Sequence, residues 1–176
     1  MNLYTFEIDL ADADRGVYET LALRVARHPS ETEDFLVTRV LAYCLEYQQG
    51  IEFSRGGLSE PDDPAIAVRD LTGSLVAWID IGTPAADRLH RAAKSARRVA
   101  VYMHKEGTQW LAGLAASRIH RADEIELRVV DRALIAALVA RLDRRVSFAL
   151  SVAQGEVFAS FSDTTLSGRV EPLRIG

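Results

Sequence analysis

The sequence contains almost no cysteine and no long hydrophobic run, and each absence excludes a class of protein. Cys44 is the single cysteine among 176 residues, so an internal disulfide framework is excluded and a reducing compartment is favoured. No apolar stretch approaches the ~20 residues that a membrane-spanning helix requires. The N-terminus alternates between polar and apolar residues, unlike the apolar block of a signal peptide. We therefore expect a cytoplasmic protein with no membrane partner, in which Cys44 is a buried structural thiol.

Several motifs that carry well-known chemistry are also missing. The pair Gly56-Gly57 lacks the strand, loop and helix that surround a phosphate-binding glycine motif. No nucleophile-elbow pattern marks a catalytic serine. The histidines are scattered and lack the spacing of zinc ligands: His28, His90, His104 and His120. The sequence therefore does not predict a nucleotide-binding loop, a zinc centre or a hydrolase of the nucleophile-elbow type.

The overall composition is that of an ordinary globular protein. Apolar residues make up 48% of the chain and charged residues 26%, and 176 residues is a usual size for one domain. No internal repeat or low-complexity linker divides the chain, so we expect a single domain over residues 1–176. The net charge of −4 argues against a strongly basic nucleic-acid coat, although a local basic patch would suffice for binding.

The alternation of apolar residues and the turn signals predict a mixed α/β layer structure. Ser30 is expected to cap a helix, with Glu33 completing a capping box, and Asp131 is expected to cap another. The segment around Gln154-Gly155-Glu156 is typical of a hairpin turn. Strands are expected at 3–10, 18–26, 51–54, 65–68, 75–82, 99–103 and 126–130, in a hairpin over 146–161, and at 165–175. Helices are expected at 30–49, 85–97, 108–117 and 131–142, and a loop at 55–64.

One acidic residue stands out because of its apolar surroundings. The run 75–82 is hydrophobic without alternation, which is typical of a central strand covered on both faces. Asp80 lies near the end of that run. An ionised carboxylate buried there costs several kcal/mol unless it is paired, hydrogen-bonded or bound to a metal. The sequence therefore predicts a compensating partner for Asp80.

Three short motifs in the same order resemble the YaeQ family of small bacterial proteins. They are Arg27-His28-Pro29-Ser30-Glu31-Thr32, then Asp70-Leu71-Thr72-Gly73, then Trp78-Ile79-Asp80-Ile81-Gly82 with Pro84. The resemblance runs from end to end. It implies a restriction-endonuclease-like fold of the PD-(D/E)XK class, in which a central mixed β-sheet is flanked by helices, with β-hairpins at the N- and C-termini. Such a core has the order helix, three strands, helix, strand, and the elements expected from 30–49 to 99–103 follow that order.

The resemblance also implies a chemistry. Proteins of this class are nuclease-like, and hydrolysis of a phosphodiester needs a cation that polarises the phosphoryl oxygen and activates water. Mg²⁺ is held by carboxylate oxygens and waters. Glu31, Asp70 and Asp80 are the carboxylates expected to hold it. Their alternative roles are a first-turn helix acid for Glu31 and a turn aspartate for Asp70.

The basic half of the motif departs from the family pattern. The lysine of this class is expected two residues after Asp80, where this chain has Gly82. In some such enzymes the following helix supplies the lysine, so Arg91 and Lys94 are the residues expected to stabilise the phosphate. Arginine stabilises charge but does not serve as a base near neutrality. The alternative role of both residues is a solvated helix face.

The spacing of the aspartates leaves their pairing open. If Thr72-Gly73 forms a tight turn, Asp70 lies five residue pairs from Asp80, roughly 17 Å at ~3.4 Å per residue, which is too far to share one metal ion. The same register places Ala65 opposite Asp80. The second carboxylate is then either Asp70, from a looser turn, or Asp62 or Asp63, and the family motif favours Asp70.

Two functions follow from these observations. The first is a metal-dependent nuclease-like protein that acts on nucleic-acid phosphodiesters, with Mg²⁺ as its cofactor and nucleic acid as its partner. The second is a catalytically inactive interaction or regulatory module that keeps the nuclease fold. The glycine at position 82 and the acidic net charge favour the second function.

Overall fold

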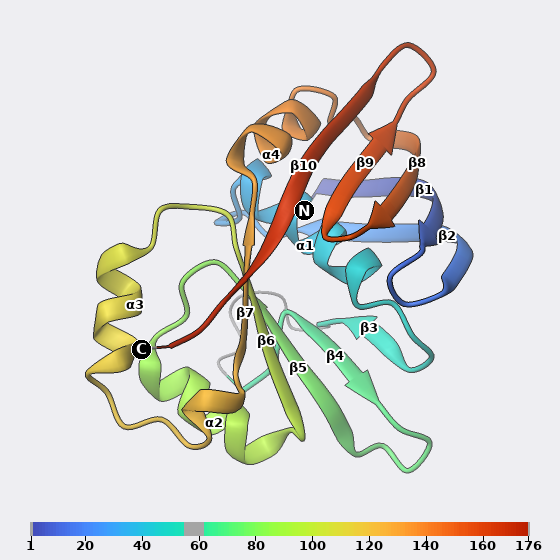
Figure 1. The fold of residues 1–176 in the computed structure, drawn as a ribbon. Helices are drawn as coiled ribbons and strands as arrows, with labels where there is room; N and C mark the ends of the chain where they lie inside the picture. Colours follow the sequence, from blue (N-terminus) through green and yellow to red (C-terminus); the bar gives the residue numbers. More distant parts are fainter. Residues whose placement is uncertain (1, 55–61, 176) are drawn as a thin grey trace. The chain divides into compact units, whose positions relative to one another are not determined.

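The computed structural model describes residues 2–54 and 62–175, which form two compact units. The first unit comprises Met1–Leu45 and Val130–Glu171, and the second comprises Glu46–Val129 and Pro172–Gly176. Figure 1 shows strands and helices in both units, so the predicted mixed α/β class is confirmed. Most of the loop expected over 55–64 lies outside the described residues. Among the described residues, no helix is long and apolar enough to cross a membrane.

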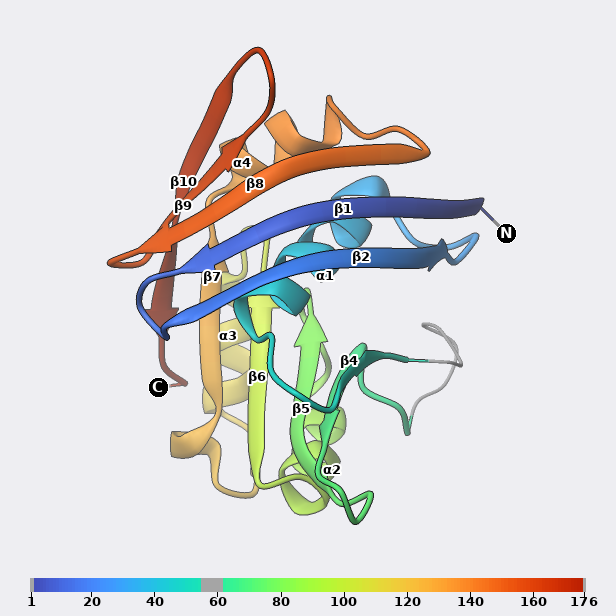
Figure 2. The same cartoon turned by 90° about the vertical axis from the view of Figure 1, so that its right-hand side faces the viewer.

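The first unit is a sheet of strand order β2-β1-β8-β9-β10 with two helices (Figure 2). Both terminal hairpins are confirmed, because β1 pairs antiparallel with β2 and β8 pairs antiparallel with β9. β1 and β8 are parallel neighbours. The strands are β1 Asn2–Asp12, β2 Val17–Arg27, β8 Arg145–Ala153, β9 Glu156–Ser160 and β10 Thr165–Leu173. The helices are α1 Glu33–Leu45 and α4 Arg132–Val139.

The core of the first unit follows from the alternation in its strands. Phe6 and Ile8 of β1 are buried and stand opposite Leu23 and Leu21 of β2, while the residues between them face outward. α1 and α4 cover the apolar face, and side chains from the sheet and both helices line a small cavity of about 20 Å³. Cys44 lies in that cavity wall, fully buried, and burial raises the pKa of its thiol to about 12. The thiol is therefore protonated and unreactive at neutral pH.

The start of α1 differs from the sequence prediction. The helix begins at Glu33, where Thr32 accepts a hydrogen bond from the Phe35 N–H at 3.1 Å. Ser30 is not the cap, because its hydroxyl bonds Nδ1 of His28 at 2.7 Å, and its N–H donates to the same nitrogen. The helix also ends at Leu45 instead of about residue 49. Asp131 does cap α4 as predicted, accepting from the Ala133 N–H at 2.8 Å.

The second unit is a mixed sheet of strand order β7-β6-β5-β4-β3. β3, β4 and β5 are antiparallel, whereas β5, β6 and β7 are parallel and are connected through helices. The strands are β3 Ile51–Phe53, β4 Ile66–Arg69, β5 Leu75–Ile81, β6 Arg98–Met103 and β7 Glu126–Val130. The helices are α2 Ala86–Ser95 and α3 Thr108–Ala115, with a short 3₁₀ turn at Ala122–Glu124. The hydrophobic run around Asp80 is a central strand, as its composition predicts.

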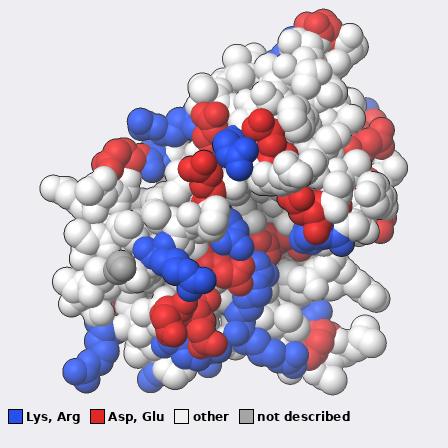
Figure 3. Space-filling view, in the orientation of Figure 1, with Lys and Arg blue, Asp and Glu red and all other residues white. Residues whose placement is uncertain are grey.

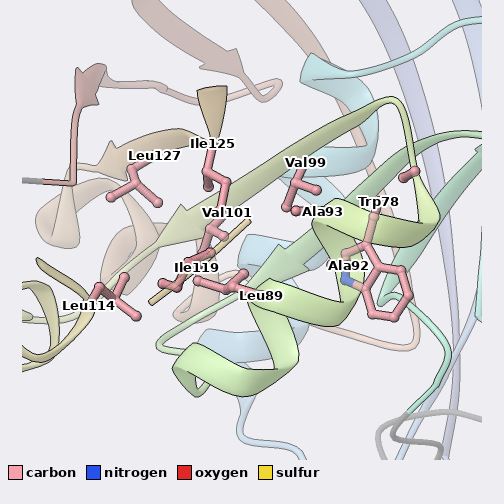
Figure 4. Close-up of a cluster of buried hydrophobic side chains, with 11 residues drawn as sticks. Trp78, Leu89, Ala92, Ala93, Val99, Val101, Leu114, Ile119, Ile125 and Leu127 are labelled. Atoms are coloured by element: carbon pink, nitrogen blue, oxygen red, sulfur yellow. The ribbon is translucent and has the colours of Figure 1, made fainter. Parts of the chain in front are cut away.

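The helices of the second unit cover one face of its sheet. Figure 4 shows Leu89, Ala92 and Ala93 of α2 packed toward Val99 and Val101 of β6. Alanines at these helix positions allow the helix to approach the sheet closely. Both neighbours of Asp80 in β5 are also buried, so this strand is covered on its two faces.

Candidate functional site

Asp80 is compensated by an arginine from the next helix. Its side chain lies at the end of β5 with only 3% of the residue exposed. Arg88 of α2 binds both carboxylate oxygens, from Nε to Oδ2 at 2.7 Å and from Nη2 to Oδ1 at 3.1 Å. The Ala65 N–H donates to Oδ1 at 3.3 Å. Two parallel charge-assisted bonds of this kind are among the strongest polar contacts in proteins, so the buried charge is neutralised.

Arg88 joins several elements of the second unit. Its guanidinium carbon lies 5.1 Å from the centre of the Trp78 ring, and Nη2 donates to the Asp63 carbonyl at 2.7 Å. Burial alone would lower the pKa of Arg88, but the hydrogen bond and charge of Asp80, together with the charges of Asp62 and Asp63, raise it overall. Arg88 is therefore a permanent cation that holds α2 against β5 and the start of β4.

Asp70 organises the turn between β4 and β5. Its Oδ1 accepts hydrogen bonds from the Thr72 hydroxyl at 2.6 Å and from the N–H groups of Thr72 and Ser74, each at 3.0 Å. Oδ2 accepts from Arg97 at 3.1 Å. The hydrogen bond from the Thr72 hydroxyl is the main cause that lowers the pKa of Asp70, with further help from the two amides and Arg97. This geometry matches the turn role of Asp70.

The register of the β4–β5 hairpin separates the two aspartates. Ile66 pairs with Ile79, so Ala65 stands opposite Asp80. A register shift after Val68 then pairs Arg69, and not Asp70, with Leu75, so the turn is one residue longer than a tight turn. Gly73 donates its N–H to the Asp70 carbonyl at 3.0 Å, which closes the turn at the other end of the hairpin. Asp70 therefore lies about six residue pairs from Asp80 along the hairpin, roughly 20 Å at ~3.4 Å per residue, whereas two ligands of one Mg²⁺ each lie ~2.1 Å from the ion. Asp63, and not Asp70, lies at the Asp80 end.

Glu31 belongs to the first unit, where it has its own arginine. The residue is 2% exposed, and Arg39 of α1 binds Oε2 through Nε at 3.0 Å and Oε1 through Nη2 at 3.1 Å. The His28 N–H also donates to Oε1 at 3.1 Å. Arg39 donates in addition to the carbonyl of Ala26 in β2 at 3.0 Å. The pair therefore ties the end of β2 to the start of α1.

Arg91 and Lys94 lie on the exposed side of α2, and the hydrogen bonds from α2 to Asp80 come from Arg88. Both side chains are exposed, whereas Leu89 and Ala92 on the opposite flank are buried. Within the described part of the chain, neither side chain forms an ion pair. Arg97, just beyond the end of α2, is paired with Asp70.

A second polar cluster surrounds Arg98, the first residue of β6. Arg98 binds Glu46 through Nη1 at 2.6 Å and Glu126 through Nε at 2.5 Å. The Tyr102 hydroxyl donates to the other oxygen of Glu46 at 2.6 Å. Burial is the main cause that raises the pKa of Tyr102, and the Glu46 carboxylate raises it further. Arg98 is thus used inside the second unit and is not available to a phosphate.

The described residues do not assemble the predicted metal ligands. Among them no cluster of three or more histidine, cysteine, aspartate or glutamate side chains could hold a metal ion. The residue that the sequence analysis missed is Arg88. The spacing of apolar residues in α2 could have indicated it. Arg88 lies one turn before buried Ala92 and so near the buried side of the helix, whereas Arg91 and Lys94 lie on the exposed side.

Comparison with known proteins identifies the family of the chain. The profile of the YaeQ protein family matches residues 1–170. The uncharacterised YaeQ protein of Salmonella typhi is 27% identical over 159 residues, and that of Escherichia coli (strain K12) is 26% identical over 160 residues; each alignment covers 90% of this chain and 87% of the relative.

Solved structures agree with this match. The crystal structure of the YaeQ protein from Xanthomonas axonopodis pv. citri has a TM-score of 0.89 at 29% identity, covering 99% of both chains. The YaeQ protein from Pseudomonas syringae gives the same TM-score and identity, covering 98% of this chain and 95% of that one. The restriction-endonuclease-like fold that the resemblance implies stays a prediction. The chain belongs to the YaeQ family.

Proposed function

We propose that this protein is a nucleic-acid-binding module that does not use the Asp80 locus for metal-dependent hydrolysis. The observation that carries the proposal is the bidentate pair between Asp80 and Arg88. A metal ion at Asp80 would have to displace a guanidinium that already satisfies both carboxylate oxygens. The displaced Arg88 would lose its partner while still partly buried, at a cost of several kcal/mol.

The remaining ligands do not fit Mg²⁺ as they stand. Glu31 is held by Arg39 and Asp70 by its turn, so neither carboxylate is available at the Asp80 end of the hairpin. Mg²⁺ demands near-octahedral oxygen ligands at ~2.0–2.1 Å. In the proposed function Asp80 therefore has a structural role, and no metal-dependent step takes place there.

The exposed face of α2 supplies the proposed binding surface. Arg91 and Lys94 lie one turn apart and are not committed to an acidic partner in the described structure. Such cations attract phosphates without sequence preference, and each phosphate contact adds about −0.9 to the slope of log K against log salt. On the face shown in Figure 3, basic and acidic side chains are interspersed. We therefore expect weak binding that involves few phosphates and is strongly reduced by salt.

A binding experiment tests this surface directly. Fluorescence anisotropy of labelled single- and double-stranded oligonucleotides is compared for the wild type and for Arg91→Ala/Lys94→Ala. We expect the double variant to bind at least tenfold more weakly and to have a shallower salt dependence. The matched control is Arg132→Ala/Arg145→Ala, which removes two exposed cations of the first unit. The absence of binding by the wild type, or an equal loss in the control, would contradict the proposal.

The second candidate is a metal-dependent phosphodiesterase, and one observation favours it. Asp63 lies beside Arg88, so a second acidic residue is present at the Asp80 end of the hairpin. In that function Asp80 with Asp63 or Asp62 would hold Mg²⁺, and Arg91 or Lys94 would stabilise the phosphate.

A cleavage assay separates the two candidates. Oligonucleotide cleavage is measured during titration with Mg²⁺ and Mn²⁺ for the wild type, Asp80→Asn and the control Asp70→Asn. The binding-module proposal expects no metal-dependent cleavage by any of the three proteins. Cleavage by the wild type that Asp80→Asn abolishes and Asp70→Asn retains would establish the second candidate instead.

A further inference from the structure

β2 is a long, regular edge strand in the sheet of the first unit (Figure 2). It pairs with β1 over eleven consecutive residues, from Val17 to Arg27, without a register shift. An edge strand exposes one row of backbone N–H and C=O groups that another strand can pair with. The strand is therefore a place where a partner chain could extend the sheet.

The hydrogen bonds of β1 show which residues of β2 point outward. The Thr5 N–H donates to the carbonyl of Arg144 at 2.8 Å, so the odd-numbered residues of β1 bond toward β8. The even-numbered residues of β1 then bond to β2, and their partners in the register are the odd-numbered residues of β2. The backbone N–H and C=O groups of the even-numbered residues of β2 consequently point away from β1, toward the open edge of the sheet. The Ala26 carbonyl agrees, because it accepts a hydrogen bond from Arg39 instead of from β1.

Four outward residues remain along the edge: Tyr18, Thr20, Ala22 and Arg24. Their side chains are all exposed, and Tyr18 is 66% exposed. Natural edge strands are protected by proline, bulges, short length or repeated charges. β2 has no proline and no bulge, and Arg24 is the single charge among these four residues.

We infer that β2 pairs antiparallel with β2 of a second copy of this chain, with the two-fold axis at Leu21. In this register Tyr18 stands opposite Arg24 of the second copy, and Thr20 stands opposite Ala22 of the second copy. Each opposed pair exchanges two backbone hydrogen bonds, so all four outward residues are satisfied by their counterparts. Tyr18 and Arg24 are complementary, because a guanidinium binds favourably over an aromatic ring.

Neighbouring registers lack this self-complementarity. An axis at Ala22 would place Tyr18 opposite Ala26, whose carbonyl is already used by Arg39. An axis at Leu23 would leave Tyr18 beyond the end of the partner strand and bring Ala26 into the pairing again. The axis at Leu21 alone uses the four outward residues and no others. The buried side chains also stay on one face, because Leu21 meets Leu21 of the second copy.

A proline substitution tests the pairing. Ala22→Pro removes an outward N–H while the bonds between β1 and β2 remain, a position where edge strands tolerate proline. Sedimentation equilibrium should give twice the 19.4 kDa chain mass for the wild type and a shift to the single-chain mass for Ala22→Pro. The matched control Ala22→Val keeps the N–H and should remain a dimer. Circular dichroism checks that each variant is folded.

Two results would overturn the inference. One is a wild type that sediments with the single-chain mass at every concentration. The other is an unchanged dimer in folded Ala22→Pro, which would mean that another surface holds the copies together. As a second readout, the amides of Thr20, Ala22 and Arg24 should exchange more slowly in the dimer, and unprotected amides would also contradict the pairing.

Cross-linking tests the register. Thr20→Cys and Ala22→Cys proteins mixed under mild oxidation should form a heterodimer, because positions 20 and 22 face each other across the axis. Ala22→Cys alone should not cross-link, and efficient cross-linking of this variant by itself would place the axis at Ala22 and overturn the assignment to Leu21. Cys44 does not interfere, because its thiol is fully buried.

Discussion

In each unit an arginine neutralises a buried carboxylate, but the two ion pairs differ in how far they are exposed to solvent. In the first unit Arg39 neutralises Glu31, and in the second Arg88 neutralises Asp80. Both arginines lie eight residues after their carboxylate, on the helix that follows. The Arg39 side chain is 7% exposed, whereas that of Arg88 is 22% exposed. The Glu31–Arg39 pair is therefore shielded from solvent, whereas solvent or a ligand can reach part of Arg88 in the Asp80–Arg88 pair.

The largest loss of stability is expected when the Glu31–Arg39 pair is broken. Arg39→Met would leave the Glu31 carboxylate buried without a countercharge and should lower the free energy of unfolding by ~3–5 kcal/mol. Urea denaturation measures the change. The double variant Glu31→Leu/Arg39→Met is the control, because it removes both charges and should cost less than Arg39→Met alone. A double variant that is less stable than the single variant would contradict the assignment of a structural pair.

A smaller loss of stability is expected when the more exposed Asp80–Arg88 pair is broken. Arg88→Met should lower the free energy of unfolding by about 2–3 kcal/mol, because water can partly solvate the Asp80 carboxylate that is left behind. Comparison with Arg39→Met under the same conditions ranks the two pairs. If Arg88→Met costs as much as Arg39→Met, the difference in exposure has no energetic consequence.

The start of α1 provides a third test in the first unit. Thr32→Ala removes the side-chain acceptor of the Phe35 N–H and should cost ~1 kcal/mol, the usual value for a lost N-cap. Ser30→Ala should cost less, because the Ser30 hydroxyl bonds His28 and not a helix amide. Thermal unfolding of the two variants compares them. A larger loss for Ser30→Ala would restore the capping box predicted from sequence.

The smallest effect on stability is expected at low pH, at the Asp70 turn between β4 and β5. The pKa of Asp70 is lowered in the folded protein, so its ionised form stabilises the fold above its unfolded pKa of about 3.9, and this contribution is lost as pH falls through the lower folded pKa. Asp70→Asn should therefore flatten the loss of stability at low pH. Urea denaturation from neutral pH to below pH 4 measures the slope. A slope identical to that of the wild type would mean that the turn does not depend on the charge.

Most helices and strands could be predicted from sequence, because they depend on the spacing of apolar residues and on turn residues within each segment. The alternation in β1, β2, β8 and β9 produced both hairpins, and the apolar run 75–82 indicated a strand buried on two faces. The prediction at the start of α1 was wrong by three residues. Ser30 and Thr32 are both good caps, and the contact of Ser30 with His28 decided between them.

The candidate site was predicted only in part, because its contacts are not local. The need for a partner at Asp80 followed from burial, but Arg88 was not identified from the sequence, which pointed only to Arg91 and Lys94 as cations for a phosphate. The family motif pointed to Asp70, although the alternative hairpin register placed Asp63 nearer to Asp80. No linker signal marked the two units, because the chain passes between them at Leu45–Glu46, Val129–Val130 and Glu171–Pro172, without a change in composition.

The sequence by itself determined the pattern of strands and helices, the presence of a turn at Asp70 and the requirement that Asp80 be compensated. These features depend on side-chain periodicity, turn chemistry and the cost of burying a charge. Only the tertiary structure decided that Arg88 meets Asp80, that Arg39 meets Glu31 and that Asp70 is far from Asp80. Each of these contacts depends on strand register and on the rotation of a helix against its sheet, and both are set by packing the whole core.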